Sequence, residues 1–114
     1  MVVLVESDTR KCAFLATVSR QLGLNVRIEN ARVEALANLG ARTISARALA
    51  PLDELLPLAR RHLADNGECL FLKGATVESE LTAIDRIWNS SVETIPSVTD
   101  PSGVVLRIGD IQIA

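Results

Sequence analysis

The chain opens with the stretch MVVLVESD, residues 1–8, and this stretch with the residues after it decides the fold. Its first five residues are apolar, and three polar residues end the run. An unbroken aliphatic run of this length is typical of an interior parallel strand that is buried on both faces. Apolar side chains then recur at helical spacing from Thr9 to Leu22, with Ser7 or Asp8 as the N-cap and Gly23 as the stop. The opening therefore predicts a strand followed by a helix.

The same alternation continues along the chain and then changes. Further strands are expected over residues 24–28, 42–46 and 69–72, a short helix or turn over 30–39, and helices from Pro51 to the Asn66-Gly67 stop and from Thr76 through Trp88. The tail reads as two strands, residues 92–98 and 104–113, joined by Asp100-Pro101-Ser102-Gly103, which suits a type I turn. The sequence thus predicts an α/β fold whose mostly parallel sheet is covered on both faces and ends in an antiparallel hairpin.

Composition limits the function classes. The chain has 114 residues, 14 acidic against 12 basic side chains and a net charge of -2, which suits one globular domain. With 48% apolar residues, disorder is excluded, and 3% aromatic residues argue against a stacking platform for single-stranded nucleic acid. No run approaches the ~18 apolar residues of a membrane span, and the opening run is too short and lacks a basic leader for a signal peptide. A cytoplasmic protein without a membrane partner is expected.

Three isolated side chains are expected to have no catalytic or metal-binding role. Cys12 and Cys69 lie in apolar segments without His or Cys at metal spacing, so both are expected to be small buried hydrophobes, and no metal site is predicted. His62 follows Arg61 on a predicted helix and is expected to be a solvated surface residue.

Polar residues follow four of the predicted strands, where parallel sheets bind ligands. The Glu6 carboxylate could accept hydrogen bonds from both hydroxyls of a ribose, or it could simply cap a helix or face solvent. Arg47 leaves a buried strand, so it must meet water, a phosphate or a carboxylate such as Glu6 or Glu34. Arg32 and Lys73 could neutralise phosphates or be ordinary solvated strand ends. The four segments are Glu6-Ser7-Asp8, Asn30-Ala31-Arg32, Ser45-Ala46-Arg47 and Lys73-Gly74.

A response-regulator receiver is one interpretation of these strand ends. Glu6 with Asp8, Thr43 or Ser45, and Lys73 imitate its acids, hydroxyl and lysine. The phospho-acceptor aspartate at a central strand end is missing, however, and a hairpin stands in place of a fifth parallel strand and helix. Both features count against a phosphorelay role.

Four runs, Leu4–Leu15, Asn30–Glu34, Ser45–Leu52 and Phe71–Gly74, closely resemble the bacterial ribosomal RNA small-subunit methyltransferase G family, also called glucose-inhibited division protein B. The resemblance implies part of a class I, Rossmann-like three-layer sandwich and the cofactor S-adenosyl-L-methionine. It also implies that the substrate is a guanine N7 in small-subunit ribosomal RNA. Such sheets end in an antiparallel hairpin, which the tail of this chain also predicts.

The resemblance also implies roles for individual residues. Glu6 is similar to the acid that holds the cofactor ribose, with Ser7 beside it, and Val33 and Glu34 match the segment that borders the adenine. Arg47 matches an arginine near the methyl-transfer site, which makes it both the catalytic and a cofactor-binding candidate. The basic residues expected to meet RNA are Arg10, Lys11, Arg32 and Lys73.

The chain departs from the family in one large respect. A family member should have, before the position of Met1, a helical region, a first strand and a glycine-rich turn for the methionine part of the cofactor. That strand would lie between the strands at residues 2–5 and 43–46, and its loss would leave two apolar edges unpaired. We therefore expect one incomplete domain over residues 1–114, inactive alone. Its two open strands should pair directly or be covered by a second copy. The alternative is a non-enzymatic α/β interaction module that oligomerises through these edges.

Overall fold

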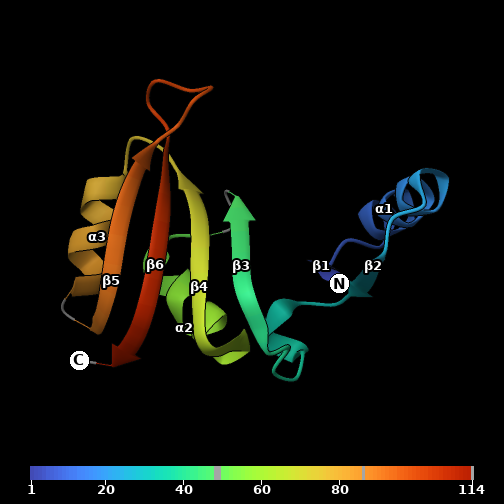
Figure 1. The fold of residues 1–114 in the computed structure, drawn as a ribbon, viewed down its shortest axis with the longest axis horizontal. Coiled ribbons are helices and arrows are strands. Elements are labelled where there is room, and N and C mark those ends of the chain that lie inside the picture. The colour runs from blue at the N-terminus through green and yellow to red at the C-terminus, as the bar shows by residue number, and fades with distance from the viewer. Residues whose placement is uncertain (48–49, 86, 114) are drawn as a thin grey trace. The chain divides into compact units, whose positions relative to one another are not determined.

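The structure is a computed structural model that describes residues 1–47, 50–85 and 87–113, and it divides into two compact units (Figure 1). Unit 1, residues 1–37, contains β1 (Val2–Glu6), α1 (Thr9–Leu22), β2 (Val26–Asn30) and the 3-10 helix η1 (Val33–Ala35). Unit 2, residues 38–114, contains β3 (Ala41–Arg47), α2 (Leu52–His62), β4 (Leu63–Lys73), α3 (Val77–Asp85), β5 (Trp88–Pro96) and β6 (Val104–Ile113). The prediction of one incomplete domain stays a prediction.

Unit 1 is a parallel strand pair with one connecting helix. β1 and β2 run in register from Val2 opposite Val26 to Glu6 opposite Asn30. α1 starts after Asp8, whose carboxylate accepts hydrogen bonds from two backbone N–H groups of the first turn. The helix ends at Gly23, where φ is 64° and a side chain would be strained. The predicted strand, helix, cap and stop are confirmed. Among the described residues 1–37, Cys12 is the one buried side chain, so the core of unit 1 is small.

Unit 2 contains a four-stranded sheet in the order β3-β4-β6-β5. β3 and β4 are parallel, whereas β6 runs antiparallel to both of its neighbours. β5 and β6 form the predicted hairpin, and the Gly103 N–H donates to the Asp100 carbonyl at 3.0 Å across the predicted turn. The C-terminal hairpin is therefore confirmed.

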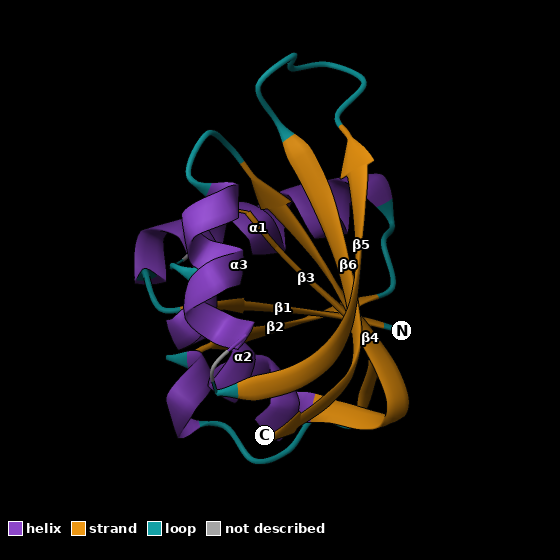
Figure 2. Cartoon of the chain, turned by 90° about the vertical axis from the view of Figure 1, so that its left-hand side faces the viewer, coloured by secondary structure: helices purple, strands orange, loops and turns teal. Residues whose placement is uncertain are grey.

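The core of unit 2 lies on one face of this sheet, where α2 and α3 pack side by side (Figure 2). Apolar residues at helical spacing on α2 meet alternate residues of the strands. On β4, Phe71 is 1% exposed while its neighbour Leu72 is 45% exposed. Helices of unit 2 thus cover one face, where the sequence predicted cover on both. The fully or nearly buried members of the core include Leu52, Leu55, Leu56, Cys69, Phe71, Ile84, Leu106 and Ile108.

The strands form two sheets where one was expected. In unit 1, β1 pairs with β2, and in unit 2, β3 pairs with β4. Each of these parallel pairs is connected through a single helix. The prediction that the two open strands pair directly joins strands of different units and stays a prediction. A second copy that covers the edges stays a prediction.

Element ends differ where a helix was expected to continue. α2 ends at His62 and β4 begins at the next residue, whereas the sequence predicted a helix as far as Asn66. Pro57 lies inside this one continuous helix, which does not restart there. α3 ends at Asp85, and Trp88 opens β5 although it was expected on a helix. In the described part of the chain, no helix is both long and apolar enough to cross a membrane.

Candidate functional site

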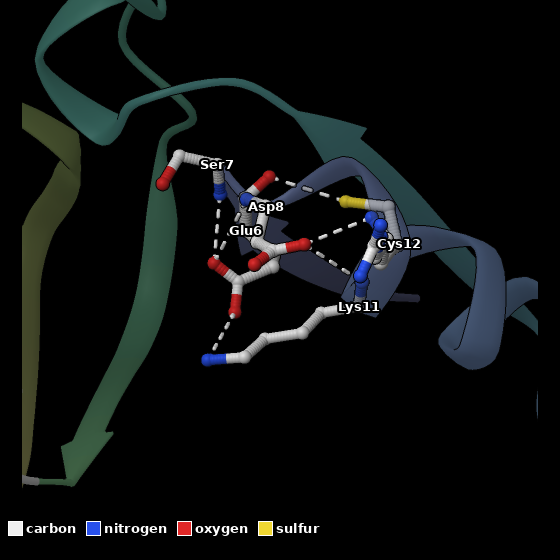
Figure 3. A network of polar contacts seen from close by, with 6 residues as sticks. Glu6, Ser7, Asp8, Lys11 and Cys12 are labelled. Carbon is white, nitrogen blue, oxygen red and sulfur yellow. Dashed lines mark hydrogen bonds and ion pairs between the residues drawn. The ribbon is translucent and has the colours of Figure 1, made fainter.

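The carboxyl end of β1 presents an oriented carboxylate (Figure 3). Glu6 Oε2 accepts hydrogen bonds from the N–H groups of Ser7 at 2.8 Å and Asp8 at 3.3 Å. Glu6 Oε1 lies 3.9 Å from Nζ of Lys11, and the Glu6 side chain is 30% exposed. Two carboxylate oxygens offer about four lone-pair positions, so Glu6 keeps acceptor capacity toward solvent. The turn therefore holds an acid that can still bind hydroxyl groups.

The backbone of Glu6 is held from two sides. Its carbonyl oxygen accepts from the Cys12 thiol at 3.2 Å and from the Ala31 N–H at 3.1 Å. Burial, together with the nearby charges of Glu6 and Asp8, raises the pKa of the Cys12 thiol. A protonated thiol is the hydrogen-bond donor that this contact needs. Cys12 is thus a buried structural residue, as predicted, and it joins α1 to the end of β1.

The remaining predicted cofactor residues come from the same edge of unit 1. Asn30 lies opposite Glu6 in the strand register, and its side chain donates to Thr9 Oγ1 at 3.2 Å. After β2 the chain enters η1, in which Val33 is half-buried and Glu34 is exposed. Parallel strands place their carboxyl ends at one edge. Unit 1 therefore brings the end of β1 and the segment after β2 to a common edge.

The predicted RNA-binding residues of unit 1 lie near this edge and are exposed. Arg10 and Lys11 lie in the first turn of α1, and Arg32 directly precedes η1. A guanidinium or ammonium on an exposed helix start can reach a phosphate without a large desolvation cost. Their RNA-binding role stays a prediction.

Arg47 marks the corresponding edge of unit 2. It is the last residue of β3, it is exposed, and it lies opposite Leu72 of β4 in the strand register. The predicted convergence of Glu6 and Arg47 joins residues of different units and stays a prediction.

Lys73, the last residue of β4, is held inside unit 2. Its ammonium lies 2.9 Å from Glu80 Oε1 and donates to the Ala50 carbonyl at 2.7 Å, and its side chain is 9% exposed. Glu80 also accepts from the Leu52 N–H at 3.0 Å and from the Thr76 hydroxyl at 2.9 Å. Burial alone would raise the pKa of Glu80, but the hydrogen bonds from Lys73, Thr76 and Leu52 outweigh it and hold that pKa below its ordinary value.

Sequence reasoning missed the importance of Glu80. The residue lies in the first turn of α3, where an acid also complements the helix dipole. The useful signal was a strand-ending lysine followed, across one turn, by a glutamate in the first turn of a helix, since such a turn brings the two side chains together.

His62 is buried, not solvated as expected. It is 2% exposed, and its Nδ1 accepts a hydrogen bond from the Leu39 N–H at 3.3 Å. His62 follows Leu55 and Ala59 at spacings of seven and three residues, which places it on the apolar face of α2. That spacing could have identified it as an interior residue.

Several solved structures that share this fold are methyltransferases. Ribosomal protein L11 methylase from Lactobacillus delbrueckii subsp. bulgaricus matches with a TM-score of 0.74 at 16% identity, over 94% of this chain and 56% of that one. M. jannaschii TYW2, solved in complex with AdoMet, matches with a TM-score of 0.66 at 12% identity, over 100% of this chain and 58% of that one. The α/β fold is therefore a partial Rossmann-like fold of the S-adenosylmethionine-dependent methyltransferase class.

Sequence comparison identifies the family. The profile of rRNA small subunit methyltransferase G matches residues 1–104. Ribosomal RNA small subunit methyltransferase G of Paramagnetospirillum magneticum is 54% identical over 109 residues, which cover 96% of this chain and 53% of that protein. The protein of the same name from Cereibacter sphaeroides strain ATCC 17025 is 56% identical over 106 residues, 93% of this chain and 51% of that protein. The chain belongs to the rRNA small subunit methyltransferase G family, which confirms the resemblance, and spans about half the length of these curated relatives.

Proposed function

We propose that this chain forms the adenosyl-binding part of an enzyme that methylates a guanine N7 of small-subunit (16S) ribosomal RNA in the cytoplasm. The observation that supports this most directly is the oriented, partly exposed carboxylate of Glu6 at the carboxyl end of β1, in a chain of this family. S-adenosyl-L-methionine, when bound, supplies the electrophilic methyl group.

The residues of unit 1 suit the adenosyl group. Glu6 accepts hydrogen bonds from the ribose hydroxyls, and the turn that begins at Ser7 keeps its carboxylate in place. Val33 and Glu34 border the adenine from the segment after β2. A carboxylate already oriented by backbone N–H groups loses little conformational freedom on binding, which favours affinity.

Arg47 serves the transfer step, and basic side chains serve the RNA. Guanine N7 carries a nucleophilic lone pair, so the reaction needs alignment and exclusion of water more than it needs a general base. A net charge of -2 gives no general attraction for RNA, so binding depends on a local basic rim. The residues proposed to contact RNA are Arg10, Lys11 and Arg32, whereas Lys73 is held by Glu80 and the Ala50 carbonyl and is not among them.

We expect the isolated chain to be inactive. In the described strands, β1 and β3 each have a neighbour on one side, and unit 1 has a small core. A cofactor edge supported by so small a core is poorly preorganised, and preorganisation is a large part of methyl-transfer catalysis. The six glycines of the sequence are scattered singly, which leaves the methionine part of the cofactor without a glycine-rich cradle in this chain.

A hybrid enzyme tests the proposal. The half of the Paramagnetospirillum protein that this chain does not match is fused ahead of residue 1, and transfer of a labelled methyl group to small-subunit RNA is measured. The hybrid should transfer the label and the isolated chain should not. The substitution Glu6→Ala should abolish transfer, while Glu29→Gln, which alters a β2 acid paired with Arg27, should not. A folded hybrid that neither binds cofactor nor transfers the label would refute the proposal.

The open strand edges favour one other function, an α/β module that assembles copies of itself. β1 and β3 each present one edge without a described partner strand, and such edges can pair with another chain. Light scattering beside a cofactor titration separates the two functions. A monomer that binds the cofactor tightly excludes the assembly module, whereas a concentration-dependent oligomer without cofactor affinity favours it.

A further inference from the structure

We propose that Lys73 and Glu80 are positioning residues. They bind Ala50 and Leu52, which follow Arg47 in the chain, to the end of β4 and thereby determine the position of the Arg47 guanidinium. The inference rests on the proposed role of Arg47 in methyl transfer. It gives Lys73 a function other than direct contact with RNA.

Consecutive residues of β4 hold both ends of the connection that follows β3. Arg47 lies opposite Leu72 in the strand register. Three residues later, the Ala50 carbonyl accepts a 2.7 Å hydrogen bond from Nζ of Lys73, the residue after Leu72. The sheet therefore holds Arg47, and the Lys73 ammonium holds Ala50, three residues later.

Glu80 completes the arrangement because its carboxylate joins three elements. Oε1 receives the Lys73 ammonium from β4 and the N–H of Leu52, the first residue of α2. Oε2 receives the Thr76 hydroxyl just before α3. Loss of this carboxylate would leave the Leu52 N–H and a nearly buried ammonium without their acceptor, which favours opening of this segment.

The Lys73–Glu80 pair is much more buried than the surface charges of the chain. The Lys73 and Glu80 side chains are 9% and 14% exposed, whereas that of Lys11 is 69% exposed. Salt screens buried pairs much less than exposed ones, so this contact persists at physiological ionic strength. An ammonium that neutralised an RNA phosphate would have to leave Glu80 and Ala50, and the cost of stranding that carboxylate opposes such a movement. The lowered pKa of Glu80 agrees with a carboxylate that stays ionised beside Lys73.

Limited digestion of the full chain with trypsin tests the positioning directly, because the β3 residues up to Arg47 are paired with β4 and must leave the sheet before trypsin can bind them and cut after Arg47. The variant is Glu80→Gln, and the matched control is Glu78→Gln, an exposed acid in the same helical turn. Cleavage after Arg107, inside β6, reports opening of the whole of unit 2 in the same digest. Glu80→Gln should speed cleavage after Arg47 by about tenfold relative to Arg107, since a charged hydrogen-bond network stabilises the closed segment. Glu78→Gln should leave both rates unchanged.

Equal acceleration at Arg47 and Arg107 would mean that the pair only stabilises unit 2, and unchanged cleavage would mean that it holds nothing at Arg47. Either result overturns the inference. Lys73→Met, which removes the ammonium and one trypsin site, provides a second variant with the same expected pattern.

The hybrid enzyme then tests whether the position of Arg47 affects methyl transfer. Glu80→Gln should lower kcat about tenfold or more with little change in the KM for S-adenosylmethionine, because misplacement of Arg47 affects alignment more than binding. If Glu80→Gln leaves the kcat of the hybrid unchanged, the positioning role of Lys73 and Glu80 is refuted. A hybrid that is inactive without any substitution counts against the proposed function, while the trypsin pattern still decides whether the pair positions Arg47.

Discussion

The backbone N–H of Leu39 donates a hydrogen bond to Nδ1 of His62, and the imidazole that accepts it is 2% exposed. The contact joins the segment before β3 to the last residue of α2. Nδ1 must be unprotonated to accept this bond. His62 is therefore a buried hydrogen-bond acceptor that holds the segment before β3 against the end of α2.

Removing this acceptor should destabilise unit 2 substantially. His62→Ala deletes a buried ring and strands the Leu39 N–H, so we expect the free energy of unfolding to fall by about 2–4 kcal/mol. His62→Asn keeps an acceptor of similar reach and should cost less. Urea unfolding of the two variants measures the difference. Equal losses would show that packing volume, and not the hydrogen bond, gives His62 its effect.

Features set by neighbouring residues were predictable from the sequence. Asp8 and Gly23 were recognised as cap and stop of α1 because capping depends on one side chain or one backbone conformation. The turn at 100–103 was recognised for the same reason. At the site, the position of Glu6 at a strand end followed from the apolar run before it. These are interactions over a few residues, which a single sequence displays directly.

Features that join distant segments were not predictable. The Glu80 carboxylate accepts from the Leu52 N–H, 28 residues away, and nothing in the local pattern marks that partner. The hydrogen bond that His62 accepts likewise comes from Leu39, 23 residues earlier.

Gly67 should tolerate a side chain poorly. It lies in β4 near the irregular pairing between Ala41 and Thr43, and a Cβ there would stand 2.9 Å from the Ala41 carbonyl oxygen. Gly67→Ala should therefore lower the free energy of unfolding by about 1–3 kcal/mol. Gly74→Ala is the matched control, because a Cβ at Gly74 would meet no atom within 4 Å. Thermal melts of both variants provide the comparison, and similar losses would contradict the steric argument.

The contribution of Glu80 to stability should depend on pH in one direction. Its pKa lies below the ordinary value of 4.5 in the folded chain, so the folded state binds this proton more weakly than the unfolded state. The stabilisation is therefore complete above about pH 4.5 and is lost as the pH falls through the lower folded pKa. The difference in unfolding free energy between the native chain and Glu80→Gln should shrink below that pH. A difference that grows on acidification would contradict the assigned direction.

The two thiols should report separate stabilities for the two units. Cys69 is fully buried in the core of unit 2, and burial, with a smaller contribution from the charge of Glu68, raises its pKa to about 12. Cys12 is the buried residue of a much smaller core. Because thiolates react and both native thiols stay protonated near neutral pH, alkylation must proceed through opened states.

Iodoacetamide should therefore modify Cys12 faster than Cys69 in the native chain, and at lower urea concentrations. The reason is that unit 1 buries little apolar surface to oppose opening, whereas the Cys69 strand opens only with the core that surrounds it. Cys12→Ser and Cys69→Ser variants, followed by mass spectrometry, assign each rate to one thiol. Equal rates at every urea concentration would show that residues 1–37 and 38–114 open as one cooperative body. Faster reaction at Cys69 would contradict its place in the core.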